Sequence, residues 1–84
     1  SRFTLYPNPT QGDIYLGITH PSDKINVQIY DLNGQKVMSE IFDGDTETSV
    51  QTLSIRVNHL LPPGIYFVKI STGDSNATEK MIVQ

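Results

Sequence analysis

Apolar and polar residues alternate with a period of two along most of this chain. One run places Ile14, Leu16 and Ile18 in alternation with Tyr15 and Gly17. Successive side chains of a strand point to opposite faces, so this pattern predicts half-buried β-strands rather than helices. The same period recurs in further runs, at residues 25–30, 37–41, 53–57, 66–70 and 79–83.

Turn-forming residues separate these runs at short spacing. Asn33-Gly34 lies between two alternating runs, and both residues tolerate the positive φ of a tight hairpin turn. Pro7 and Pro9 exclude helix and central strand, which predicts a stiff lead-in that closes in a turn at Gly12. Pro62-Pro63-Gly64 sets the start of the strand that follows. About seven short strands at this spacing predict an all-β antiparallel sandwich of two sheets.

Composition narrows the class of protein. The chain has 84 residues, enough for a single domain over 1–84. It has no cysteine, a formal net charge of −3 and only six scattered Lys and Arg, so it lacks the basic footprint of a nucleic-acid or membrane binder. It begins at Ser1 without an initiator methionine, from which we expect a piece excised from a longer secreted protein.

The residues that usually carry chemistry do not form a recognisable motif. His20 and His59 stand outside any metal-ligand spacing, and no serine lies in a G-x-S-x-G turn. We therefore expect no enzyme, no metal and no cofactor. One weak alternative is a calcium-stabilised adhesion module, because Asp43, Asp45 and Glu47 alternate in an acidic loop, although carboxylates in a turn are usually solvated.

Three collinear blocks carry a resemblance to a known family. They are Tyr6-Pro7-Asn8-Pro9 with Gly12, the segment VQIYDLNGQKV around Asn33-Gly34, and Pro63-Gly64-Ile65-Tyr66 followed by the closing Lys80-Met81-Ile82-Val83. In this order and spacing they resemble the C-terminal sorting domain of proteins exported by the type IX secretion system of Bacteroidetes. The resemblance implies an immunoglobulin-like antiparallel β-sandwich of about seven strands, which agrees with the strand count.

The resemblance also implies a function. Domains of this family are secretion and sorting signals that direct an upstream cargo across the outer membrane, by way of the periplasm, to the cell surface or the medium. Their expected partners are the type IX translocon, its shuttle proteins and a sortase-like cysteine protease that removes the domain. Neither nucleic acid nor a small-molecule substrate is expected as a partner.

The last strand is the candidate element for translocon recognition. A partner would add a strand to its edge, while Lys80 either guards that edge or contacts an acidic partner. Deletion of 80–84 is expected to abolish export and leave the sandwich largely folded. The recognition set is Lys80, Met81, Ile82, Val83 and Gln84. The motif residues interpreted as setting the fold rather than making contacts are Tyr6, Pro7, Asn8, Pro9, Gly12, Asn33, Gly34, Pro63, Gly64 and Tyr66.

Two further possibilities stay open from the sequence. A fibronectin-like accessory module or a carbohydrate-binding β-sandwich would show a row of exposed aromatic residues on one sheet face. Open sheet edges would also permit a dimer of the isolated fragment.

Overall fold

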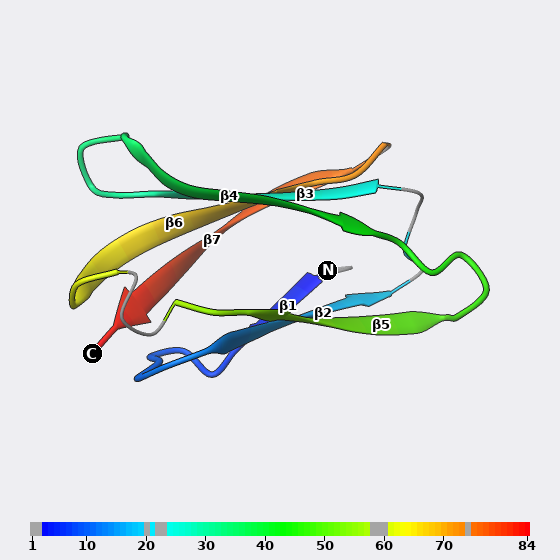
Figure 1. Ribbon diagram of the computed structural model, residues 1–84, viewed down its shortest axis with the longest axis horizontal. Coiled ribbons are helices and arrows are strands. Elements are labelled where there is room, and N and C mark those ends of the chain that lie inside the picture. The colour runs from blue at the N-terminus through cyan, green and yellow to red at the C-terminus, as the bar shows by residue number, and fades with distance from the viewer. Residues whose placement is uncertain (1–2, 20, 22–23, 58–60, 74) are drawn as a thin grey trace.

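The computed structural model describes residues 3–19, 21, 24–57, 61–73 and 75–84, which form seven strands joined by turns (Figure 1). No helix long and apolar enough to cross a membrane occurs in this described part of the chain. The predicted all-β fold is confirmed. The strands are β1 (Phe3–Tyr6), β2 (Ile14–Thr19), β3 (Lys24–Tyr30), β4 (Lys36–Asp43), β5 (Val50–Ile55), β6 (Gly64–Ser71) and β7 (Asn76–Val83).

The strands form two layers that face each other, as an immunoglobulin-like sandwich does (Figure 1). One sheet has the order β1-β2-β5 and the other the order β4-β3-β6-β7. Every pairing between these strands is antiparallel. The last strand, β7, is therefore an edge of the four-stranded sheet, and β4 is the opposite edge.

The core lies between the sheets and takes the apolar residues that the period of two predicts. In β2, Ile14, Leu16 and Ile18 are fully buried while Tyr15 is exposed. The same alternation holds in β3 and β6. The buried apolar residues are Phe3, Ile14, Leu16, Ile18, Ile25, Val27, Ile29, Leu53, Ile55, Val57, Tyr66, Val68, Ile70, Met81 and Val83.

The β4 strand departs from the expected half-buried pattern. Val37 and Ile41, which the alternation assigns to a buried face, are 41% and 65% exposed. Ile41 lies opposite Asn26 on the outer face, whereas Phe42 lies opposite the buried Ile25. An edge strand has a neighbour on one side only, so its inner residues pack only partly against the core and its apolar outer residues stay in solvent.

The hairpin between β3 and β4 is confirmed, but its turn is longer than expected. The Gly34 N–H donates to the Asp31 carbonyl and the Asp31 N–H to the Gln35 carbonyl, both at 3.0 Å, which leaves three residues in the loop. Gly34 has a φ of +83°, as a three-residue loop of this kind requires at its last position. The Asp31 carboxylate accepts the N–H groups of Asn33 and Gln35 at 2.9 and 3.0 Å. This Asp31 side chain fixes the longer loop, and the sequence reasoning did not single it out.

Candidate functional site

The five candidate recognition residues divide between the two faces of β7. Met81 and Val83 are 0% and 7% exposed and belong to the core. Lys80 and Gln84 are exposed and Ile82 is half-buried. Ile82 lies opposite Ile65 of β6, a residue on the outer face. Only Lys80, Ile82 and Gln84 therefore present side chains to a partner of the folded domain.

The backbone edge of β7 is closed by the side chain of Asn8. The Asn8 Nδ2 donates to the Lys80 carbonyl at 2.7 Å, and its Oδ1 accepts the N–H of Ile82 at 3.0 Å. A carboxamide has the same donor and acceptor as a peptide group. The Asn8 side chain thus takes the place that a peptide of a neighbouring strand would occupy.

Thr10 continues this closure with its own backbone. Its N–H donates to the Ile82 carbonyl and its carbonyl accepts the N–H of Gln84, both at 2.8 Å, so that Thr10 and Val83 form a parallel bridge. Thr10 is 1% exposed, and its hydroxyl accepts the N–H of Gly12 at 3.1 Å. Figure 1 shows the loop between β1 and β2 beside the end of β7. Residues 8–10 therefore cover the β7 edge from the Lys80 carbonyl to the Gln84 N–H.

The expectation that the edge of residues 80–84 is open to strand addition is wrong. The outward carbonyl of Lys80, both outward groups of Ile82 and the N–H of Gln84 already have partners. Pro7 and Pro9, both preceded by cis peptide bonds, exclude a regular strand at residues 7–9. The Asn8 side chain forms the hydrogen bonds to Lys80 and Ile82 that the backbone of such a strand would form. The sequence feature that corresponds to this closed edge is an asparagine between two prolines. Asn8, one of the residues interpreted as setting the fold, makes a direct contact with β7.

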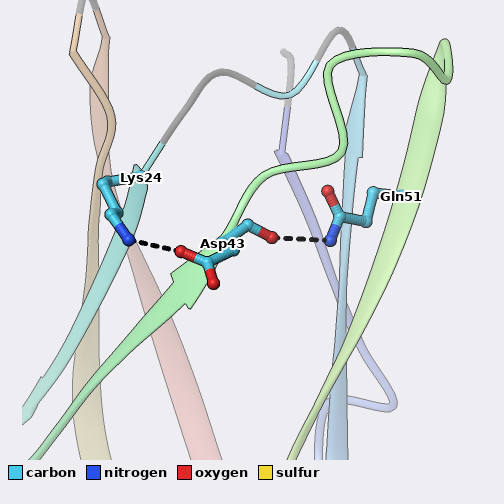
Figure 2. A network of polar contacts seen from close by, with 3 residues as sticks. All are labelled: Lys24, Asp43 and Gln51. Atoms are coloured by element: carbon cyan, nitrogen blue, oxygen red, sulfur yellow. Dashed lines mark hydrogen bonds and ion pairs between the residues drawn. The ribbon is translucent and has the colours of Figure 1, made fainter.

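The opposite edge of the four-stranded sheet is closed in the same manner (Figure 2). The Gln51 Nε2 donates to the Asp43 carbonyl at 3.1 Å, and its Oε1 accepts the N–H of Asp45 at 2.8 Å. The Asp43 carboxylate also forms an ion pair with the Lys24 ammonium. Gln51 lies in β5 of the other sheet. Each edge strand of the larger sheet is thus closed at one point by a carboxamide from outside that sheet.

The carboxylates of the acidic loop have separate partners and are not gathered at one point. Asp43 pairs with Lys24, and the Asp45 carboxylate accepts the N–H of Glu47 at 3.1 Å. No group of three potential metal-ligating side chains occurs among the residues that the structure describes. The histidine candidates, His20 and His59, lie outside the described residues.

The other motif residues act within the fold to different degrees. The Tyr66 hydroxyl donates to the Pro62 carbonyl at 2.6 Å and fastens the Pro62-Pro63-Gly64 turn to the start of β6. Gly12 has no positive φ and no atom within 4 Å of where a Cβ would lie. Nothing in its geometry requires glycine.

The aromatic residues do not form a single exposed row. Tyr6 and Tyr15 pair on the three-stranded sheet with ring centroids 5.8 Å apart, whereas Phe67 is exposed on the four-stranded sheet. Phe3 and Tyr66 belong to the core. In the described part of the chain, the row expected of a carbohydrate-binding sandwich is divided between two faces.

These features define the class: a small immunoglobulin-like β-sandwich whose last strand is tied down by a Pro-Asn-Pro segment. The family model of the secretion system C-terminal sorting domain matches residues 4–84, and the chain belongs to that family. Domains of this family are the C-terminal sorting signal of the type IX secretion system, so the resemblance read from the sequence is confirmed. Such a domain is not itself catalytic, and it implies export across the outer membrane.

A solved structure shares the fold. The crystal structure of dimeric latent PorU from Porphyromonas gingivalis contains a match with a TM-score of 0.73 and 19% sequence identity. The match covers 96% of this chain and 9% of that one, so the chain spans a small part of that protein's length. A search of curated proteins finds no match to this sequence.

Proposed function

We propose that the transport machinery recognises the folded domain by binding the side chains of Lys80, Ile82 and Gln84. The observation that supports this is the division of β7: its backbone edge at these residues is bonded to Asn8 and Thr10, while these three side chains point outward. Lys80 lies directly opposite Phe67 in the register of β6 and β7, so a charged and an aromatic residue are neighbours on this face. The translocon and the shuttle proteins are the partners.

Met81 and Val83 contribute to recognition indirectly. Both are buried, and they hold β7 against the core so that its outer side chains keep their positions. Deletion of 80–84 would remove both core residues together with the bonds to Asn8 and Thr10. The sequence predicted that this deletion would leave the sandwich largely folded. Because a domain of this size has a stability margin of only a few kcal/mol, we now expect the truncation to unfold it. It would not separate recognition from folding.

A charge reversal at Lys80 separates the two. The test fuses the domain to a periplasmic reporter in cells that carry a type IX system and measures reporter in the medium and on the cell surface. Lys80→Glu should reduce export strongly without lowering the melting temperature, because Lys80 is exposed. Arg56→Glu is the matched control, since Arg56 is also exposed and lies beyond the end of β5 in the other sheet.

Deletion of the whole domain provides the reference for the loss of sorting. If Lys80→Glu is exported as efficiently as the parent while whole-domain deletion stops export, recognition by these side chains is refuted and the sorting function is not. Equal loss with Arg56→Glu would instead indicate a general response to charge.

We further propose that the domain is removed after translocation by a sortase-like cysteine protease that cleaves N-terminal to it. The support is the family membership. In this proposal the domain itself performs no reaction, and its cargo passes through the periplasm to the cell surface or the medium. Mass spectrometry of the exported reporter should find the reporter without these 84 residues. A reporter that keeps the domain outside the cell would contradict the processing step.

A further inference from the structure

The outer face of the four-stranded sheet carries an unusual set of side chains. The pairing registers place its residues in rows that run across β4, β3, β6 and β7. One row joins Lys36, Tyr30, Phe67 and Lys80 in this order. The next row on one side contains Gln28 and Lys69, and the next on the other side contains Ile65 opposite Ile82.

This face is positively charged although the domain is negatively charged overall. Four of the six basic residues of the chain, Lys24, Lys36, Lys69 and Lys80, occupy its register positions. Asp43 is the acidic residue among these positions, and it pairs with Lys24.

The acidic residues of the neighbouring strand positions point the other way. Glu40 and Glu79 lie opposite Val27 and Val68, which face the core. No ion pair within the described residues engages Lys36, Lys69 or Lys80, and all three are exposed. In a chain of net charge −3, this face therefore concentrates uncompensated positive charge.

An apolar area adjoins these lysines. Ile65 and Phe67 are 38% and 37% exposed, and they adjoin the half-buried Ile82 and Tyr30. Stable protein interfaces have an apolar centre rich in aromatic residues and a polar rim exposed to solvent. Lys36 and Lys80 end the row that contains Phe67, and Lys69 lies in the row on one side of it. Ile65 and Ile82 extend the apolar area on the other side, so charged residues border it in part.

We infer that this lysine-rimmed face, defined by Tyr30, Lys36, Ile65, Phe67, Lys69, Lys80 and Ile82, is a docking surface for an acidic protein surface of the transport machinery. The inference rests on the proposed function and extends the recognition surface from β7 across β6 and β3 to β4. Charge complementarity selects the partner: a protein patch with an apolar middle and carboxylates at its edge would meet both features.

The apolar centre favours a protein over an anionic polymer or membrane. Phosphate-rich or sulfate-rich partners are bound by closely spaced basic groups, with little use for an exposed aliphatic centre. Here the lysines are separated by Tyr30 and Phe67 in one row, and Lys69 adjoins Gln28 in the next.

The test uses the full reporter fusion with charge changes that leave β7 intact. Lys36→Glu/Lys69→Glu reverses two rim charges while Lys80 keeps its charge. Lys36→Arg/Lys69→Arg preserves the charge, and Arg56→Glu controls for an exposed reversal elsewhere. We expect about a tenfold fall in exported reporter for the double Glu variant, because reversed charges repel an acidic patch, and near-parental export for the other two.

Each result separates this inference from the proposed function. If Lys80→Glu blocks export while Lys36→Glu/Lys69→Glu is exported normally, the wider docking surface is refuted and recognition through β7 stands. If neither variant affects export, both the wider docking surface and recognition through the β7 side chains are refuted. Vesicles of phosphatidylglycerol and phosphatidylcholine serve as the membrane probe. The lipid alternative predicts that the parent domain binds these vesicles, that the double Glu variant does not, and that the double Glu variant is exported normally. That combination would assign the face to anionic lipid and overturn the protein-docking inference.

Discussion

The replacement Asn8→Ala gives the most direct test of how the β7 edge is closed. It removes the hydrogen bond to the Lys80 carbonyl and the one from the Ile82 N–H, which measure 2.7 and 3.0 Å. A hydrogen bond of this kind contributes about 0.5–1.5 kcal/mol net, and both lie near solvent, so the expected loss in the free energy of unfolding is about 1–2 kcal/mol. For a domain of this size that corresponds to a fall in melting temperature of roughly 5–10 °C.

Two measurements report on this change. Thermal or urea unfolding followed by circular dichroism gives the stability, and amide hydrogen exchange gives the local effect. The Ile82 amide should exchange faster in Asn8→Ala because its hydrogen bond is lost. The Met81 amide points toward β6 in the ladder, so its protection from exchange should fall only by the amount that the global loss of stability causes.

Matched variants identify the cause. Asn8→Asp keeps the acceptor for Ile82 but replaces the donor to Lys80 with a charged oxygen, so it should be at least as destabilising as alanine. Asn76→Ala, an exposed asparagine at the start of the same strand, should change stability by less than about 0.5 kcal/mol. Unchanged stability and unchanged Ile82 exchange in Asn8→Ala would refute closure by the Asn8 side chain.

Three further predictions concern other parts of the fold. Tyr66→Phe removes the hydrogen bond to the Pro62 carbonyl and should lower the free energy of unfolding by about 1 kcal/mol, with the strand content unchanged. An unaltered denaturant midpoint in chemical unfolding would contradict a stabilising role for the hydroxyl. Gly34→Ala should cost roughly 1–2 kcal/mol because φ is +83°, whereas Gly12→Ala should be neutral or slightly stabilising, and equal effects in thermal melts would argue against this distinction. Gln51→Ala frees the Asp43 carbonyl and Asp45 N–H at the β4 edge and should raise the dimer fraction in light scattering at high protein concentration; a variant as monomeric as the parent would show that Gln51 does not protect this edge.

The strands were predictable where a residue's face decides its burial. Ile14, Leu16 and Ile18 follow the period of two because a slip by one residue would expose all three. The periodicity did not predict β1, because this strand has only four residues, of which Phe3 alone is buried. Burial in β4 was mispredicted because periodicity shows which residues share a face, but it does not reveal which strand lies at the edge of a sheet.

The closed edge was out of reach for a different reason. Asn8 and Lys80 are 72 positions apart in the chain, and their contact depends on how β1 and β7 are placed in two different sheets. Local sequence indicates that Pro7 and Pro9 break a strand, but not what the side chain between them bonds to. Gln51 was missed on the same ground, since its partner Asp43 belongs to the edge of the other sheet.

The closed edge bears on how a folded domain can serve as a signal without aggregating. An exposed edge strand recruits any other exposed edge, including that of a second copy, because backbone pairing carries little sequence information. The Asn8 carboxamide and the Thr10 backbone occupy the β7 groups that such pairing would use, and they leave the side chains of Lys80 and Ile82 free. We therefore expect recognition to rest on side-chain chemistry, which differs from one protein surface to the next. A partner that engaged the β7 backbone would first have to displace residues 8–10, so a covalent tie between Thr10 and Val83 would block such a partner and leave side-chain recognition intact. A cysteine pair at these positions, compared in oxidised and reduced form for export of the fused reporter, would decide between the two modes.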